Sequence, residues 1–166
     1  MISIILNPKT IEPEDYADRF TVKAVIVNNE GNVLLFRSNL IGGGVEEGET
    51  NEQALHREVL EETGIEIEII KPLGQVIAYR DATKQIYRMF GYECKYIRKV
   101  KEPIDETTNP AFWENPKDSI SRFQSDIYML KKADKSLYEP AVYEAKLYNR
   151  EMSLIFLKES FKEQAH

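Results

Sequence analysis

Three glutamates at helical spacing are the residues of this sequence that are best suited to take part in chemistry. Glu58 is followed by Glu61 and Glu62, and on a helix residues three and four apart share one side. Like charges at that spacing repel and weaken a helix by about 0.2–0.5 kcal/mol per pair when nothing neutralises them. A hard divalent cation removes that penalty because it accepts carboxylate oxygens as ligands. The spacing therefore indicates a candidate metal site.

Two neighbouring features suit a phosphate substrate. Arg57 lies four residues before Glu61 and can brace one carboxylate while the others face a metal. The preceding run, Ile41-Gly42-Gly43-Gly44, lets the backbone approach a ligand and turn carbonyls or amides toward it. Taken singly, an acidic helix face is usually just solvated and a glycine run is usually a turn. Their combination is what favours metal-assisted attack of water on a phosphate.

The joint spacing resembles the Nudix box, Gly-x5-Glu-x7-Arg-Glu-U-x-Glu-Glu-x-Gly-U, in which U is a bulky aliphatic residue. At background frequencies of about one in fifteen for the fixed identities, chance agreement is on the order of one in a million per chain. One departure is Ile41, which stands where many family members have proline, and it leaves the carboxylates intact. The specified positions are all filled, by Gly43, Glu49, Arg57, Glu58, Val59, Glu61, Glu62, Gly64 and Ile65.

The resemblance implies roles for the box residues. The three box glutamates would bind Mg²⁺ or Mn²⁺, with the Gly43 carbonyl as a further ligand. Arg57 would orient a glutamate through a salt bridge, and Glu49 would contribute secondarily. The general base varies within the family, so two candidates stay open: Glu58 in the box and Glu106 in a later loop. For Glu106, a solvated loop acid is the ordinary alternative.

Substrate contacts outside the box are less defined. Arg37, at the end of the strand that leads into the glycine run, is a candidate phosphate ligand, although a cation at a strand end also has an ordinary explanation. Several aromatic residues could stack on a base, but aromatic residues on strands more often belong to the core. These are Tyr79, Tyr87, Phe112 and Trp113.

The implied activity is hydrolysis of a phosphoanhydride bond in a nucleoside diphosphate linked to another moiety. The substrates left open are nucleoside triphosphates, nucleotide sugars, dinucleoside polyphosphates and capped RNA ends. A non-catalytic Nudix-like sensor of nucleotides is the alternative, and we rank it second because such a protein is expected to have lost box glutamates. A third hypothesis is an interaction domain that uses its C-terminal helices.

The elements that must position these residues can be read from capping and periodicity. Thr50 and Gln53 form a capping box for a helix that runs through Glu62 or Thr63 and stops at Gly64. Loop is expected through about Phe20 after a short first strand, and again over 102–116. The remaining expected elements are strands at 2–6, 21–27, 33–37, 65–70, 75–79 and 85–97, and helices from Lys117 and from Pro140 to about Phe161.

The strand count alone supports a mixed α and β domain. The resemblance implies more: an α+β Nudix fold, an α/β/α sandwich with a mixed, curved central sheet and helices on both faces. We expect residues 1–166 to form a single Nudix hydrolase domain with a helical C-terminal extension from about residue 117. That extension either covers the sheet or mediates a homodimer.

Composition sets broad limits on function. The chain has 166 residues, 42% of them hydrophobic, and a formal net charge of -6. No basic stripe is available for long nucleic acid, but a small nucleotide-like substrate can bind if metal is supplied locally. Cys94 is the only cysteine, so no intrachain disulfide or cysteine-based zinc cluster can form. The apolar run Ile2–Leu6 is too short for a signal peptide or membrane span, which favours a cytoplasmic protein.

Overall fold

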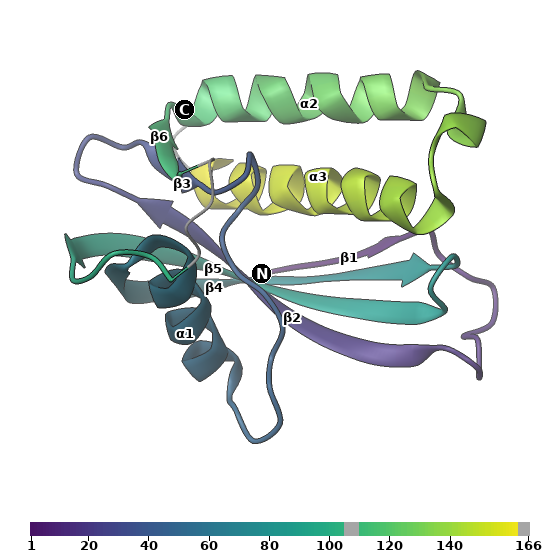
Figure 1. The fold of residues 1–166 in the computed structure, drawn as a ribbon, viewed down its shortest axis with the longest axis horizontal. Helices are drawn as coiled ribbons and strands as arrows, with labels where there is room; N and C mark the ends of the chain where they lie inside the picture. The colour runs from purple at the N-terminus through teal and green to yellow at the C-terminus, as the bar shows by residue number, and fades with distance from the viewer. Residues whose placement is uncertain (105–109, 163–166) are drawn as a thin grey trace.

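A six-stranded mixed sheet forms the centre of the molecule, and helices cover both of its faces (Figure 1). The computed structural model describes residues 1–104 and 110–162. The strand order is β1-β4-β5-β2-β3-β6. The elements are β1 (Ile2–Leu6), β2 (Ala17–Val27), β3 (Val33–Leu35), α1 (Asn51–Thr63), β4 (Ile65–Arg80), β5 (Gln85–Lys99), β6 (Phe112–Glu114), α2 (Pro116–Lys132), the short 3₁₀ helix η1 (Lys135–Leu137) and α3 (Pro140–Phe161).

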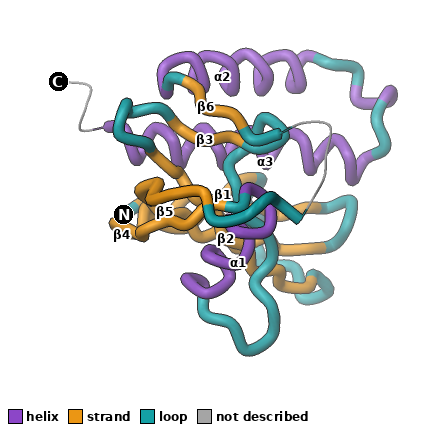
Figure 2. Tube along the Cα trace, turned by 60° about the vertical axis from the view of Figure 1, so that its left-hand side comes forward, coloured by secondary structure: helices purple, strands orange, loops and turns teal. Residues whose placement is uncertain are grey.

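The sheet is mixed because it contains both parallel and antiparallel pairs of neighbouring strands. β1 runs parallel to β4, and β2 runs parallel to β5, whereas β4–β5, β2–β3 and β3–β6 are antiparallel pairs. Figure 2 shows α1 on one side of the strands and the α2–α3 pair on the other. The expected α/β/α sandwich with a mixed sheet is confirmed.

The two faces of the sheet support separate apolar clusters. On one face α1 contributes Ala54, Leu55 and Val59, all fully buried against β2 and β3. On the other face α3 contributes Phe156 and Leu157, which are also fully buried. Burying a side chain of this size contributes about 1.5–3 kcal/mol. The C-terminal helical segment therefore covers the sheet, one of the two roles expected for it.

The ends of α1 follow the expected local chemistry. The Thr50 hydroxyl accepts a hydrogen bond from Gln53 N–H at 3.2 Å, and the Gln53 side chain accepts one from Thr50 N–H at 2.9 Å. Gly64 closes the helix in the left-handed conformation, with φ of 69°. Because both ends are fixed, the carboxylates on the intervening turns have a defined position relative to the sheet.

Two expectations about strand boundaries at the N-terminal half are wrong. Loop was expected through Phe20, but β2 already begins at Ala17, because residues 17–20 pair in parallel with Gln85–Arg88 of β5. β3 was expected to reach Arg37, but it ends at Leu35. A tight turn follows, in which Phe36 bridges to Asn39 and Arg37 has a positive φ of 48°.

Two further expectations differ after α1. Residues 65–80 form one long strand rather than two, because shifts in register against β5 absorb Pro72 and Gly74. The expected loop over 102–116 contains β6, a three-residue strand that pairs with β3. In the described parts of the chain, no helix is long and apolar enough to cross a membrane.

Candidate active site

The glycine run lies along β2 and faces α1. Ala24 N–H donates to the Ile41 carbonyl at 2.9 Å, and Val22 N–H donates to the Gly43 carbonyl at 3.0 Å. Val45 N–H then donates to the Phe20 carbonyl at 3.0 Å. These bonds hold residues 41–45, which we call the glycine segment, beside β2 as a continuation of the edge that β3 begins.

Two carboxylates of α1 meet the backbone of the glycine segment. Gly42 N–H donates to Glu62 Oε2 at 3.1 Å. A Cβ atom on Gly43 would lie 2.5 Å from the carboxyl atoms of Glu58, closer than real Cβ contacts allow. Glycine at position 43 therefore leaves the space into which the Glu58 carboxylate fits, and one helix side brings two carboxylates to one stretch of backbone.

Arg57 connects the acidic residues of the box with one another. Its Nε and Nη2 donate to the two oxygens of Glu49 at 2.7 and 2.9 Å, a bidentate pair. Its Nη1 donates to Glu58 Oε1 at 2.8 Å and to Glu61 Oε2 at 3.4 Å. Nη2 also donates to the Gly44 carbonyl at 2.9 Å. A single guanidinium thus fixes α1, its preceding loop and the glycine segment relative to one another.

Arg57→Lys is expected to loosen this arrangement, because lysine cannot make the bidentate contact. The hydrogen bonds from Arg57 hold the pKa of Glu49 at about 2, below its ordinary 4.5. A depressed pKa stabilises the fold above pH 4.5, and that contribution is lost as pH falls toward 2. In the variant, the Glu49 pKa should move back toward 4.5, as followed by NMR titration of its carboxyl carbon. Turnover should fall by about 10–100-fold. An unmoved Glu49 pKa would contradict this account.

Lys23 is a site residue that sequence reasoning missed. Its Nζ donates to the Gly42 carbonyl at 2.8 Å and to the Leu40 carbonyl at 3.3 Å. Burial lowers the pKa of this ammonium, while the carboxylates of Glu62 and Glu58 act in the opposite direction. Burial raises the pKa of Glu62, against the Gly42 N–H and the Lys23 charge. The sequence feature that could have identified Lys23 is its position as the one charged residue in the otherwise mostly apolar run Thr21–Val27.

The other expected residues are distributed around this centre. Glu61 is the most exposed of the three box glutamates that contact Arg57, with 42% of its side chain accessible. Arg37 lies over the Phe36 ring at 5.0 Å and near enough to Glu62 to act against the rise in its pKa. Glu106 lies outside the described residues. Within the described ranges, no three His, Cys, Asp or Glu side chains are gathered into a preformed metal site.

A polar depression opens beside Glu58. Gly44 and Glu46 line it from the glycine segment and its continuation, and Asp18 and Arg19 line it from β2. The Arg19 guanidinium lies 3.7 Å from where a Gly44 Cβ would stand. Sequence reasoning missed Arg19 because it assigned residues before Thr21 to a loop. The cation is placed to meet an anionic group beside the carboxylates.

Comparison with known proteins decides the family. The sequence pattern of the NUDIX domain matches residues 18–139. The chain belongs to the Nudix hydrolase superfamily. A MutT-like protein of Streptomyces ambofaciens is 31% identical over 120 residues, which covers 69% of this chain and 74% of that protein. A nucleoside triphosphatase, NudI, of an Enterobacter species (strain 638) is 37% identical over 89 residues, covering 42% of this chain and 63% of that protein.

A solved structure shows the same Nudix fold. The Nudix hydrolase from Nitrosomonas europaea superposes with a TM-score of 0.56 at 23% identity, covering 80% of this chain and 90% of that one. Taken with the family match, the chain is a Nudix-type pyrophosphohydrolase. Nudix enzymes typically depend on a divalent metal.

Proposed function

We propose that this Nudix enzyme hydrolyses a phosphoanhydride bond in a nucleoside diphosphate linked to another moiety. The observation that carries the proposal is the convergence of Glu58 and Glu62 on the backbone of Gly42 and Gly43. Mg²⁺ or Mn²⁺ would be held by those two carboxylates together with Glu61 and the Gly43 carbonyl.

The residues present fit such a cation. All the candidate ligands are oxygens, as hard divalent ions prefer. The Gly43 carbonyl accepts one hydrogen bond from Val22 N–H, which leaves its second lone pair for a ligand. The candidate ligands include three carboxylates. Among the described residues, the cations that contact these carboxylates or the glycine segment are two, Arg57 and Lys23, so negative charge is in excess. When bound, a divalent ion would balance this negative charge, shield the anhydride oxygens and lower the pKa of water.

The chain's own groups can then act on the substrate. Glu58 accepts a hydrogen bond from Arg57 through one oxygen, and its carboxylate lies against Gly43, where it can accept a proton from the attacking water. We therefore assign Glu58 as general base, with Glu106 as the second candidate. Arg37 lies near enough to Glu62 to act on its pKa, and Arg19 lines the depression beside Glu58, so each can neutralise a phosphate that the attack leaves negatively charged.

The relatives support a small nucleotide as substrate. The two relatives named above are called MutT-like protein and nucleoside triphosphatase, so nucleoside triphosphates come first on the panel to be tested. Another similar protein is called RNA pyrophosphohydrolase, so a capped RNA end belongs on the same panel. A net charge of -6 disfavours contact with a long nucleic acid chain.

Metal removal is the experiment that tests the class of reaction. Release of phosphate and nucleotide is measured on nucleoside triphosphates, nucleotide sugars, dinucleoside polyphosphates and a capped RNA end, with Mg²⁺, with Mn²⁺ and with EDTA. We expect turnover that EDTA abolishes and that added metal restores. The metal should also raise the melting temperature by mass action. Tight nucleotide binding without turnover under any of these conditions would overturn the proposal in favour of a sensor.

A further inference from the structure

We propose that the cavity beside Glu62 binds the nucleobase of the substrate, which stacks on Trp113. The inference rests on the proposed function and adds to it the part of the substrate that the carboxylates do not contact. The cavity has a volume of about 340 Å³, which lies within the range of small-molecule pockets.

Position is the first argument. Glu62 lines this cavity, whereas Glu58 lines the polar depression that also contains Arg19. The two hollows therefore adjoin different members of the same carboxylate pair. A substrate whose anhydride lies across the pair extends naturally into both, with one moiety at each end.

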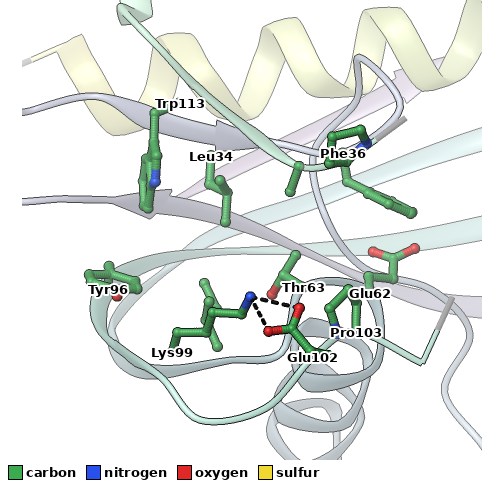
Figure 3. A pocket seen from close by; sticks show the side chains of 12 residues that line it. Leu34, Phe36, Glu62, Thr63, Tyr96, Lys99, Glu102, Pro103 and Trp113 are labelled. Carbon is green, nitrogen blue, oxygen red and sulfur yellow. Dashed lines mark hydrogen bonds and ion pairs between the residues drawn. The ribbon is translucent and has the colours of Figure 1, made fainter. Parts of the chain in front are cut away.

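Chemistry distinguishes the two ends. The depression beside Glu58 is lined mostly by charged groups, of which Asp18, Glu46 and Glu58 are acidic and Arg19 is basic, and it suits a phosphate that is accompanied by a divalent cation. The cavity beside Glu62 is lined largely by aromatic and aliphatic side chains and prolines, and suits a flat apolar ring. Figure 3 shows Tyr96 and Trp113 at one side of this cavity and the Glu62 carboxylate at the opposite side.

Trp113 is placed to serve as a stacking surface. Its register partner in β3 is Leu34, which belongs to the same buried cluster as Leu55 and Val59 of α1, so Trp113 lies on the face of the sheet that α1 covers. Tyr96 and Trp113 form a T-shaped pair, with ring centroids 5.5 Å apart and planes at 84°, and this contact restrains the orientation of the Trp113 ring. Trp113 nevertheless remains 37% exposed. Trp113 is also one of the residues that line the cavity, and an aromatic ring that borders a cavity offers a surface on which a base can stack.

Polar groups that line the cavity can form hydrogen bonds with the edge of the base. Lys99 Nζ lies 2.8 Å from both carboxylate oxygens of Glu102 (Figure 3). Together they offer a donor and an acceptor to a heterocycle. Thr63 contributes no free donor, because its hydroxyl already donates to the Val59 carbonyl at 2.6 Å. Base preference should therefore depend on Lys99 and Glu102.

The single tryptophan of the chain makes the proposal directly measurable. Adenosine and guanosine monophosphates are titrated into the metal-free protein in EDTA, with free N-acetyltryptophanamide as the correction for absorption by the base. We expect saturable quenching of Trp113 fluorescence by at least one nucleotide. Ribose 5-phosphate, which lacks a base, should produce none. Absence of saturable quenching, or equal quenching by ribose 5-phosphate, would overturn the inference.

A matched pair of variants provides a kinetic test. Trp113→Leu should raise the KM of the best nucleotide substrate about tenfold or more, while kcat changes little, because a stacking contact is lost. Trp113→Phe, which keeps an aromatic face, should recover most of the loss. Phe112→Leu is the control, since Phe112 pairs with Leu35 and so lies on the opposite face of the sheet. An unchanged KM in Trp113→Leu would overturn the inference even in an active hydrolase, whereas nucleotide quenching without hydrolysis would overturn only the proposed function.

Discussion

Replacing Glu58 or Glu62 with glutamine is expected to lower kcat/KM by about 100-fold or more. Loss of a group that merely supports a metal ligand costs about 10–100-fold, and loss of the ligand itself should cost at least as much. Glu62 contacts Gly42, whereas Glu58 contacts Gly43. Because each carboxylate has its own position on the glycine segment, neither can take over the role of the other. Steady-state kinetics at saturating metal measures the effect.

Controls separate the two roles assigned to these residues. Glu52→Gln alters an exposed acid in the first turn of the same helix and should leave kcat/KM unchanged. Raised Mn²⁺ should partly restore Glu62→Gln, whose defect is in metal binding. Glu58→Gln should stay inactive at every metal concentration, since its defect includes the base. Wild-type rates in both variants would refute the assignment.

Gly42→Ala is expected to reduce stability by about 2–4 kcal/mol, which corresponds to roughly 5–15 °C in melting temperature for a chain of this length. Gly42 has a φ of 136°, and a Cβ there would lie 2.1 Å from the Val22 carbonyl oxygen. Backbone cannot move aside as a side chain can. The glycine segment must therefore separate from β2 or carry the strain, as thermal unfolding followed by circular dichroism will show.

Two neighbouring glycines make the test specific. In Gly43→Ala the added Cβ meets only the movable carboxylate of Glu58, so turnover should fall while the melting temperature changes little. Gly48→Ala has a positive φ of 82° with nothing near its Cβ, so only backbone strain of about 1 kcal/mol is expected. If Gly42→Ala melted no lower than Gly48→Ala, the close packing of the glycine segment on β2 would be disproved.

Local signals explain why α1 and the box could be predicted. The capping box, the closing glycine and the spacing of the carboxylates all act within a few residues along the chain. β6 could not be predicted in this way, because its three residues become a strand only by pairing with β3. The pairing of Ala17–Phe20 with β5 is likewise non-local, and it hid Arg19 from sequence reasoning.

Parts of the site could not be predicted from the sequence, because they too depend on contacts between residues far apart in the chain. Lys23 resembles an interruption in an apolar strand until the glycine segment brings two carbonyls to its ammonium. Trp113 and Tyr96 are seventeen residues apart in sequence, and only the pairing of β6 with β3 brings their rings together. Sequence spacing shows which groups can share one helix side, but it does not show what folds over them.

The hydrogen bonds between the glycine segment and β2 have a consequence for solubility. An uncovered strand edge offers unpaired amides and carbonyls to another chain and promotes aggregation. Residues 41–45 occupy that edge of β2 over Phe20–Ala24. Damage that frees the segment would therefore cost more than catalysis, because it would turn a shielded strand into a template for intermolecular pairing. Variants of this segment should be judged by their tendency to precipitate as well as by their rates.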